Sequence, residues 1–179
     1  MNLLQLDKKI FLLINGLSGS WLDYFFGWVS FLGTPILFVI VLIFMVIWDR
    51  EKVSRKFLVV LISGASSWLV TLPIKSAIAR PRPYSVFRDE ILNGSVTVNN
   101  LFTTNMINSF PSAHAALVFA VAITLNVIYK NKLLFLYPIA CVIALSRIYV
   151  GAHFPSDVLG GVLLGILMAL VTRPLAAAN

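Results

Sequence analysis

Long apolar segments, separated by short polar breaks, are the feature that most limits how this chain can fold. Nearly every residue from Trp21 to Trp48 is apolar, and further apolar runs begin near Phe57, Ser112, Leu133 and Pro155. A membrane-spanning helix needs about 20 mainly apolar residues. Charged residues make up 12% of the 179, well below the roughly 25% of soluble domains. We therefore predict an all-α integral membrane protein, one domain over residues 1–179, built as a bundle of five or six transmembrane helices.

The ends of the apolar runs place the expected spans. The first ends at Trp48, and the others cover residues 57–78, 112–129, 133–146 and 155–172. The break at Gly33-Thr34-Pro35 leaves two alternatives for residues 21–32, a helix lying on the membrane or half of one long kinked span. In that break Thr34 is a candidate helix cap.

The first twenty residues have an amphipathic pattern. Apolar residues recur at helical spacing over residues 1–20, but Asp7, Lys8 and Lys9 interrupt them. This pattern predicts an amphipathic N-terminal helix at the membrane interface rather than a cleaved signal peptide. A short frayed leader is the alternative. The single cysteine, Cys141, lies within an apolar run and predicts a buried thiol.

The distribution of basic residues predicts the orientation. The net charge is +7, but the basic residues flank the apolar runs, which favours anionic lipid headgroups and excludes nucleic acid as the partner. Alternating spans place the loop 50–56, the turn 130–132 and Arg173 on one face. This face is predicted to be cytoplasmic because positive residues concentrate there.

Five more basic residues fall on the opposite, extracytoplasmic face, against that tendency: Lys75, Arg80, Arg82, Arg88 and Arg147. Their position suggests that they are retained for a local anion. The long polar segment 79–111 lies on the same face. We interpret it as an irregular extracytoplasmic loop and, because of its length, as a candidate functional segment.

Two short polar motifs begin or end the spans on this face. In the first, His153 and Asp157 are four residues apart, so the carboxylate can accept from one ring nitrogen and leave the other free to attack phosphorus. In the second, Ser112 is placed as the N-cap of an apolar helix, whose first amides form an anion site. His114, in the first turn, can deliver a proton to a leaving oxygen. Singly, these residues are also compatible with structural roles.

Taken together, three segments resemble the signature of the type-2 phosphatidic acid phosphatase (lipid phosphate phosphatase) superfamily. They are Lys75 followed after six residues by Arg82-Pro83, then Pro111-Ser-Ala-His114, then Ser146-Arg147 with His153 and Asp157 at the family spacing. Ala113 departs from the glycine common in the second motif. Since its backbone amide is retained, we expect a slightly narrower pocket rather than a loss of activity.

The resemblance implies a reaction and a site. His153 would attack the phosphorus to form a phosphohistidine, Asp157 would orient its ring, and His114 would protonate the leaving group. The phosphoryl oxygens would be held by the remaining motif residues, namely Lys75, Arg82, Ser112, Ala113 and Arg147. No metal and no cofactor are implied, and a cage of cations is a poor metal site.

The expected substrate is a membrane lipid phosphate or diphosphate, such as undecaprenyl diphosphate, phosphatidylglycerol phosphate, phosphatidic acid or lipid A 1-phosphate. The compact chain resembles bacterial members, which implies the inner membrane with a periplasmic or extracellular active site. The sequence does not choose among these lipids and does not predict an oligomeric state. A non-catalytic anion transporter is the alternative, but it would not need a nucleophile, an orienter and an acid. A vanadate-dependent haloperoxidase is disfavoured by the hydropathy.

Overall fold

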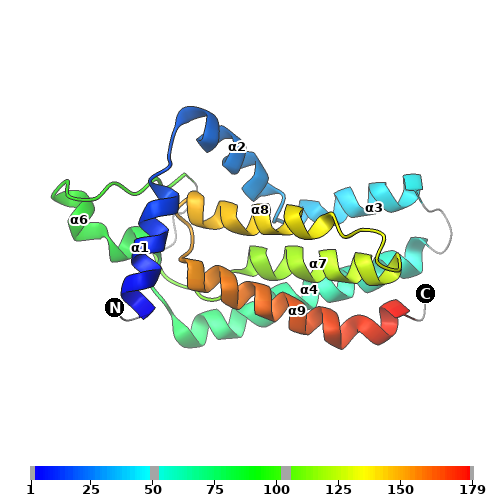
Figure 1. Ribbon diagram of the computed structural model, residues 1–179. Coiled ribbons are helices and arrows are strands. Elements are labelled where there is room, and N and C mark those ends of the chain that lie inside the picture. The colour runs from blue at the N-terminus through cyan, green and yellow to red at the C-terminus, as the bar shows by residue number, and fades with distance from the viewer. Residues whose placement is uncertain (1–2, 49–52, 102–105, 178–179) are drawn as a thin grey trace.

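The computed structural model describes residues 3–48, 53–101 and 106–177, and every regular element within these ranges is a helix (Figure 1). In chain order the helices are α1 Leu3–Asn15, α2 Ser20–Phe31, α3 Ile36–Trp48, α4 Val53–Ile78, α5 Pro83–Val86, α6 Arg88–Leu92, α7 Ala113–Ile128, α8 Leu136–Tyr149 and α9 Pro155–Ala177.

Helix α7 forms the centre of the bundle. It packs against α4, α8 and α9, and 12 of its 16 residues are buried. A helix that is apolar on all sides is typical of such a position, because no face has to meet water. The helices run so that α4 and α8 end where α7 and α9 begin (Figure 1). The extracytoplasmic ends predicted from the sequence therefore meet at one end of the bundle.

Small residues set the distances between these helices. A Cβ atom on Gly161 would lie 2.2 Å from the Ser112 carbonyl oxygen, so the backbone of α9 rests directly on the start of α7. On α4, Ser63 and Gly64 are buried, and Thr124 of α7 donates a hydrogen bond of 2.8 Å to the Ser63 hydroxyl. Close approach and interhelical hydrogen bonds are the forces that remain where lipid weakens the hydrophobic contribution.

Length and hydropathy identify the clear membrane spans. By length and hydropathy, the segments Val53–Leu92 and Pro155–Ala176 are long and apolar enough to cross a membrane, and α2 with α3 qualifies as one broken span bent by 73°. The described residues thus contain two or three clear spans. Helices α7 and α8 are shorter apolar helices of 16 and 14 residues. The total of five or six spans stays a prediction.

Three local expectations are revised. The break near residue 33 separates two helices, and the Thr34 hydroxyl donates to the Phe31 carbonyl oxygen at 2.8 Å instead of capping α3. Segment 79–111 is not wholly irregular, since it contains α5 and α6. Helix α1 forms within the predicted range, but the face that it buries includes Asp7 and Asn15 beside Phe11. Its position at the membrane interface stays a prediction.

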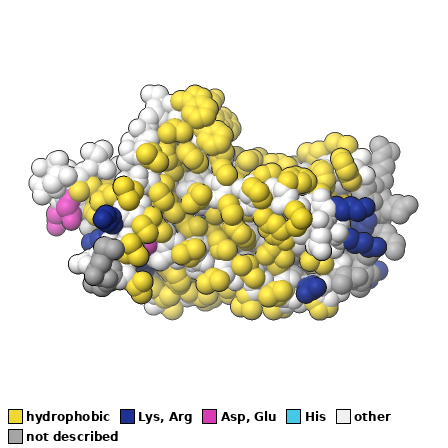
Figure 2. Space-filling view, in the orientation of Figure 1, with side chains coloured by type: hydrophobic (Ala, Val, Ile, Leu, Met, Phe, Trp, Pro, Cys, Tyr) yellow, Lys and Arg dark blue, Asp and Glu magenta, His cyan; other side chains and the backbone are white. Residues whose placement is uncertain are grey.

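The outer surface is that of a multi-pass membrane protein. Hydrophobic side chains cover the face shown in Figure 2, and basic side chains gather at the end of the bundle where the α7–α8 turn and the end of α9 lie. Lys130, Lys132 and Arg173 are exposed there. Cys141 is exposed on α8, so the prediction of a buried thiol was wrong. Its side chain lies on the apolar outer face of α8, with the exposed Ile139 and Val142.

Candidate active site

The chain between α8 and α9 reverses so tightly that His153 returns to Arg147. The backbone amides of Ala152 and His153 both donate to the Arg147 carbonyl oxygen, at 3.1 and 3.2 Å. Gly151 has φ +78°, and a Cβ atom there would lie 2.4 Å from the Asn99 carbonyl oxygen. A residue without a side chain is therefore required at this turn. The side chain of His153 becomes buried, with 2% of its surface exposed.

The start of α7 joins this turn. The backbone amide of Ser112 donates to the carbonyl oxygen of Asp157 at 2.9 Å. Ser112 occupies the N-cap position before Ala113, as predicted, but its hydroxyl makes no capping hydrogen bond. Instead this buried oxygen has no hydrogen-bond partner among the residues that the structure describes. His114 is close enough to Arg147 and His153 to interact electrostatically with both.

The side chains of the three predicted phosphate-binding cations lie near His153. Lys75 Nζ donates to the Asn108 carbonyl oxygen at 2.8 Å, and Arg82 Nη1 donates to the Ala152 carbonyl oxygen, beside His153, at 2.9 Å. Arg147 Nη1 donates to the Ser30 hydroxyl, while its buried Nε has no partner within the described part of the chain. The buried Ser112 hydroxyl and the buried Arg147 Nε–H can both donate, so an anion at this place would supply the acceptor that each lacks.

The predicted contact between His153 and Asp157 is indirect. His153 Nδ1 lies 3.8 Å from Asp157 Oδ2, which is too long for a hydrogen bond. Ser109 lies between them. Its hydroxyl donates to Asp157 Oδ2 at 2.5 Å and lies 3.5 Å from His153 Nδ1. The expected direct orienting bond is therefore replaced by an arrangement that includes a serine, which the motif analysis missed.

The surroundings keep the His153 imidazole neutral. Burial, with a smaller contribution from the nearby cations Arg147, Arg82 and Lys75, lowers its pKa from 6.5 to about 3, although Asp157 acts in the opposite direction. At neutral pH the ring therefore has an unprotonated nitrogen. Such a nitrogen can act as a nucleophile towards phosphorus.

Arg80 has a different role from the one predicted. It does not face the pocket as a free cation but forms ion pairs with Asp157 at 2.5 Å and with Asp7 at 2.6 Å. Arg88 is exposed on α6. The sequence analysis missed Asp7, although a signal was present, since Asp7, Phe11 and Asn15 are four residues apart on one face of α1. Among the described residues, no three His, Cys, Asp or Glu side chains gather into a metal site.

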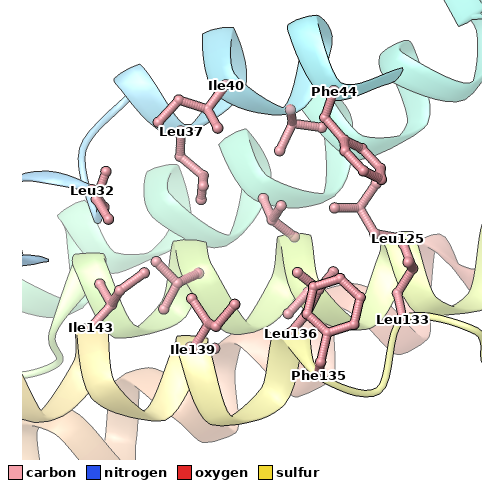
Figure 3. Close-up of a pocket in the computed structure, with 15 residues that line it drawn as sticks. Leu32, Leu37, Ile40, Phe44, Leu125, Leu133, Phe135, Leu136, Ile139 and Ile143 are labelled. Carbon is pink, nitrogen blue, oxygen red and sulfur yellow. The ribbon is translucent and has the colours of Figure 1, made fainter. Parts of the chain in front are cut away.

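An apolar groove begins beside the polar pocket. It has a volume of about 280 Å³ and is lined only by apolar side chains, from the end of α2, from α3, α7 and α8, and from the segment before α8 (Figure 3). Leu32 and Ile143 line one end. A Cβ atom on the adjacent Gly33 would lie 2.9 Å from His114 Cδ2 and 3.1 Å from Ile143 Cγ2. Gly33 thus lies against both His114 and Ile143, which lines the groove.

A helical membrane bundle with a buried neutral histidine, a second histidine and three cations at one end belongs to the class of membrane phosphatases. Comparisons with known proteins agree. The family model of the PAP2 superfamily matches residues 53–179. The chain belongs to the PAP2 superfamily, and it is a membrane lipid phosphatase.

Individual relatives show how far the similarity extends. The crystal structure of Aquifex aeolicus LpxE has a TM-score of 0.73, with 31% identity and coverage of 93% of each chain. The putative undecaprenyl-diphosphatase YbjG of Escherichia coli is 28% identical over 169 residues, which is 93% of this chain and 80% of that protein. The bacitracin transport permease protein BcrC of Bacillus licheniformis is 38% identical over 73 residues, 41% of this chain and 36% of that protein.

Proposed function

We propose that the protein removes the terminal phosphate from a membrane lipid phosphate or diphosphate through a phosphohistidine intermediate on His153, without a metal or cofactor. The observation that carries this proposal is the environment of His153. Its imidazole is buried and neutral, and it lies among Lys75, Arg82 and Arg147. A neutral nucleophile is compatible with a cationic pocket, and the pocket is matched to a substrate with several negative charges.

The first step transfers the phosphoryl group to the enzyme. The free ring nitrogen of His153 attacks phosphorus, and the bond from phosphorus to the leaving oxygen breaks. His114 gives its proton to that oxygen, and the negative charge of the bound phosphoryl group favours the protonated form of His114 beforehand. The phosphoryl oxygens are held by the three cations, the Ser112 hydroxyl and the backbone amide of Ala113.

The second step releases phosphate. Once the lipid product has taken the proton, His114 is neutral and can accept one from water. The resulting nucleophile attacks the phosphohistidine, the bond from phosphorus to the His153 nitrogen breaks, and inorganic phosphate leaves. Asp157 stabilises the His153 ring throughout, through the serine contact described above.

The apolar groove supports a lipid substrate. A headgroup in the polar pocket would have its hydrocarbon chain next to Gly33, where the groove begins. A chain lying in the groove would pack against its apolar side chains, and this packing would replace similar contacts with the surrounding lipid. Undecaprenyl diphosphate, phosphatidylglycerol phosphate, phosphatidic acid and lipid A 1-phosphate all combine a phosphoryl headgroup with such a chain.

The deciding experiment measures phosphate release by the purified protein from these four lipids in EDTA, comparing wild type with His153→Asn. We expect wild type to release phosphate from at least one lipid and the variant to lose the activity. A wild type that is inactive on every lipid, or a variant that keeps full activity, would refute the proposed reaction.

The active site is further proposed to face the periplasm or the exterior of a bacterial inner membrane. The exposed basic residues Lys130, Lys132 and Arg173 at the other end of the bundle support this orientation. A cysteine in place of the exposed Asn93, in a Cys141→Ala background, should react with an impermeant thiol reagent in whole cells or spheroplasts. Reaction only after lysis would reverse the orientation.

A further inference from the structure

Residues other than those that define the three family motifs hold the carboxylate of Asp157. Its Oδ1 accepts a hydrogen bond from Arg80 Nη1 at 2.5 Å. Its Oδ2 accepts from the Ser109 hydroxyl at 2.5 Å and from the Phe154 backbone amide at 2.8 Å. The side chain of Asp157 is fully buried. Both oxygens therefore have donors, and the carboxylate is fixed before any substrate enters.

Arg80 is held in turn by the N-terminal helix. Its Nη2 donates to Asp7 Oδ2 at 2.6 Å, and its guanidinium carbon lies 4.7 Å from the centre of the Phe154 ring. Asp7 also accepts from the amide and the hydroxyl of Ser156, at 2.9 and 2.6 Å. The planar guanidinium group thus binds Asp157 through one terminal nitrogen and Asp7 through the other. A lysine cannot reproduce this geometry.

Asp7 also balances the positive charge of Arg80. Without it, Arg80 would add a positive charge close to a pocket that already contains three cations. An Arg80 released from α1 could turn towards the phosphoryl group and leave Asp157. With Asp7 present, the side chain of Arg80 is 18% exposed and that of Asp7 8%, so the pair interacts in an environment with little water.

We propose that Asp7, Arg80 and Ser109 are positioning residues for the nucleophile. Asp7 holds Arg80, Arg80 holds Asp157, and Ser109 connects Asp157 to His153 Nδ1. The N-terminal helix is then part of the active site rather than a membrane-surface anchor alone. This inference rests on the proposed function, because it needs His153 to be the residue that is phosphorylated.

The test uses Asp7→Asn in the full-length protein, since the amide keeps the size of the side chain but removes its charge. The rate of phosphohistidine formation is measured by rapid quench with a saturating ³²P-labelled lipid phosphate, and KM is measured in the steady state. We expect the rate to fall about tenfold while KM changes by less than about twofold. Asp7→Glu, which keeps the charge, should retain more of the rate than Asp7→Asn.

Lys9→Gln is the matched control. It changes one charge at an exposed position of the same helix, and it should leave the rate of phosphohistidine formation and KM unchanged. Ser109→Ala probes the other side of the carboxylate and keeps the test valid if Asp7→Asn does not fold. It should also slow phosphohistidine formation at saturating substrate.

The outcomes separate this inference from the proposed function. If wild type forms no phosphohistidine, the proposed function fails and the inference fails with it. If wild type forms it and folded Asp7→Asn and Ser109→Ala do so at the wild-type rate, the inference alone is overturned. A lower melting temperature with an unchanged rate for each folded molecule would show a purely structural role and would also overturn it.

Discussion

The contact between Gly161 and Ser112 allows a quantitative prediction. A Cβ atom on Gly161 would lie 2.2 Å from the Ser112 carbonyl oxygen and 3.0 Å from the Ala115 Cβ. A carbon to oxygen contact is normally about 3.3 Å or more, so Gly161→Ala should push α7 and α9 apart by about 1 Å. Ser112 is the N-cap of α7 and Asp157 lies in the first turn of α9, and a 1 Å misplacement can reduce a rate by about 10². That loss corresponds to about 2.7 kcal/mol of transition-state stabilisation.

Gly161→Ala should therefore lower kcat for a lipid phosphate by about 10- to 100-fold. The added methyl group should also reduce the free energy of unfolding by about 1–3 kcal/mol through overpacking, partly offset by the better helix propensity of alanine. The assay is phosphate release in detergent micelles, together with thermal unfolding. Gly19→Ala is the control, because a Cβ atom there meets no atom within 4 Å. Wild-type kcat in Gly161→Ala would refute the reasoning.

Two further predictions concern the nucleophile and the groove. Because burial lowers the pKa of His153 to about 3, the imidazole signal of ¹³C-labelled His153 in the single-histidine variant His114→Gln should not shift between pH 8 and about pH 4.5. An ordinary titration near pH 6.5 would contradict the buried, neutral ring. Below about pH 6.5 the unfolded chain binds a proton on this histidine that the folded chain does not bind. The free energy of unfolding is therefore unaffected by His153 above about pH 6.5 and falls as the pH decreases towards 3. Ala122→Phe should fill part of the groove and lower kcat/KM for a long-chain lipid phosphate at least about tenfold, but leave para-nitrophenyl phosphate hydrolysis unchanged. Leu163→Phe, on the exposed face of α9, should affect neither substrate, and equal losses on both substrates would argue against a chain in the groove.

The motif residues could be predicted because charged and polar groups in apolar surroundings are costly. Lys75, Arg147, His153 and Asp157 are conspicuous in the sequence for that reason. Alternation of the spans then placed them on one face, and the structure brings them together. The order of the apolar runs also predicted α4, α7, α8 and α9, with ends that differ from the observed ones by a few residues, but not the short helices α5 and α6.

The supporting contacts could not be predicted in the same way. Arg80 looked like one more cation for the phosphate, since its sequence neighbourhood is the same as that of Arg82. Its partners are 73 and 77 residues away, at Asp7 and Asp157. Ser109 lies 44 residues from His153, and a serine before a proline-containing turn has no distinctive pattern. Such contacts depend on how α1, α4 and α9 are placed relative to one another.

The sequence by itself determined the membrane setting, the helical class and the charged residues of the pocket, since these follow from local composition and from residues that are costly to bury. Only the tertiary structure decided how His153, the proposed nucleophile, is held and where the apolar groove lies. Those features depend on differences of about 1 Å in the distance between helices that are far apart in the chain. Glycine contacts such as Gly161 with Ser112 set these distances, and no local pattern encodes them.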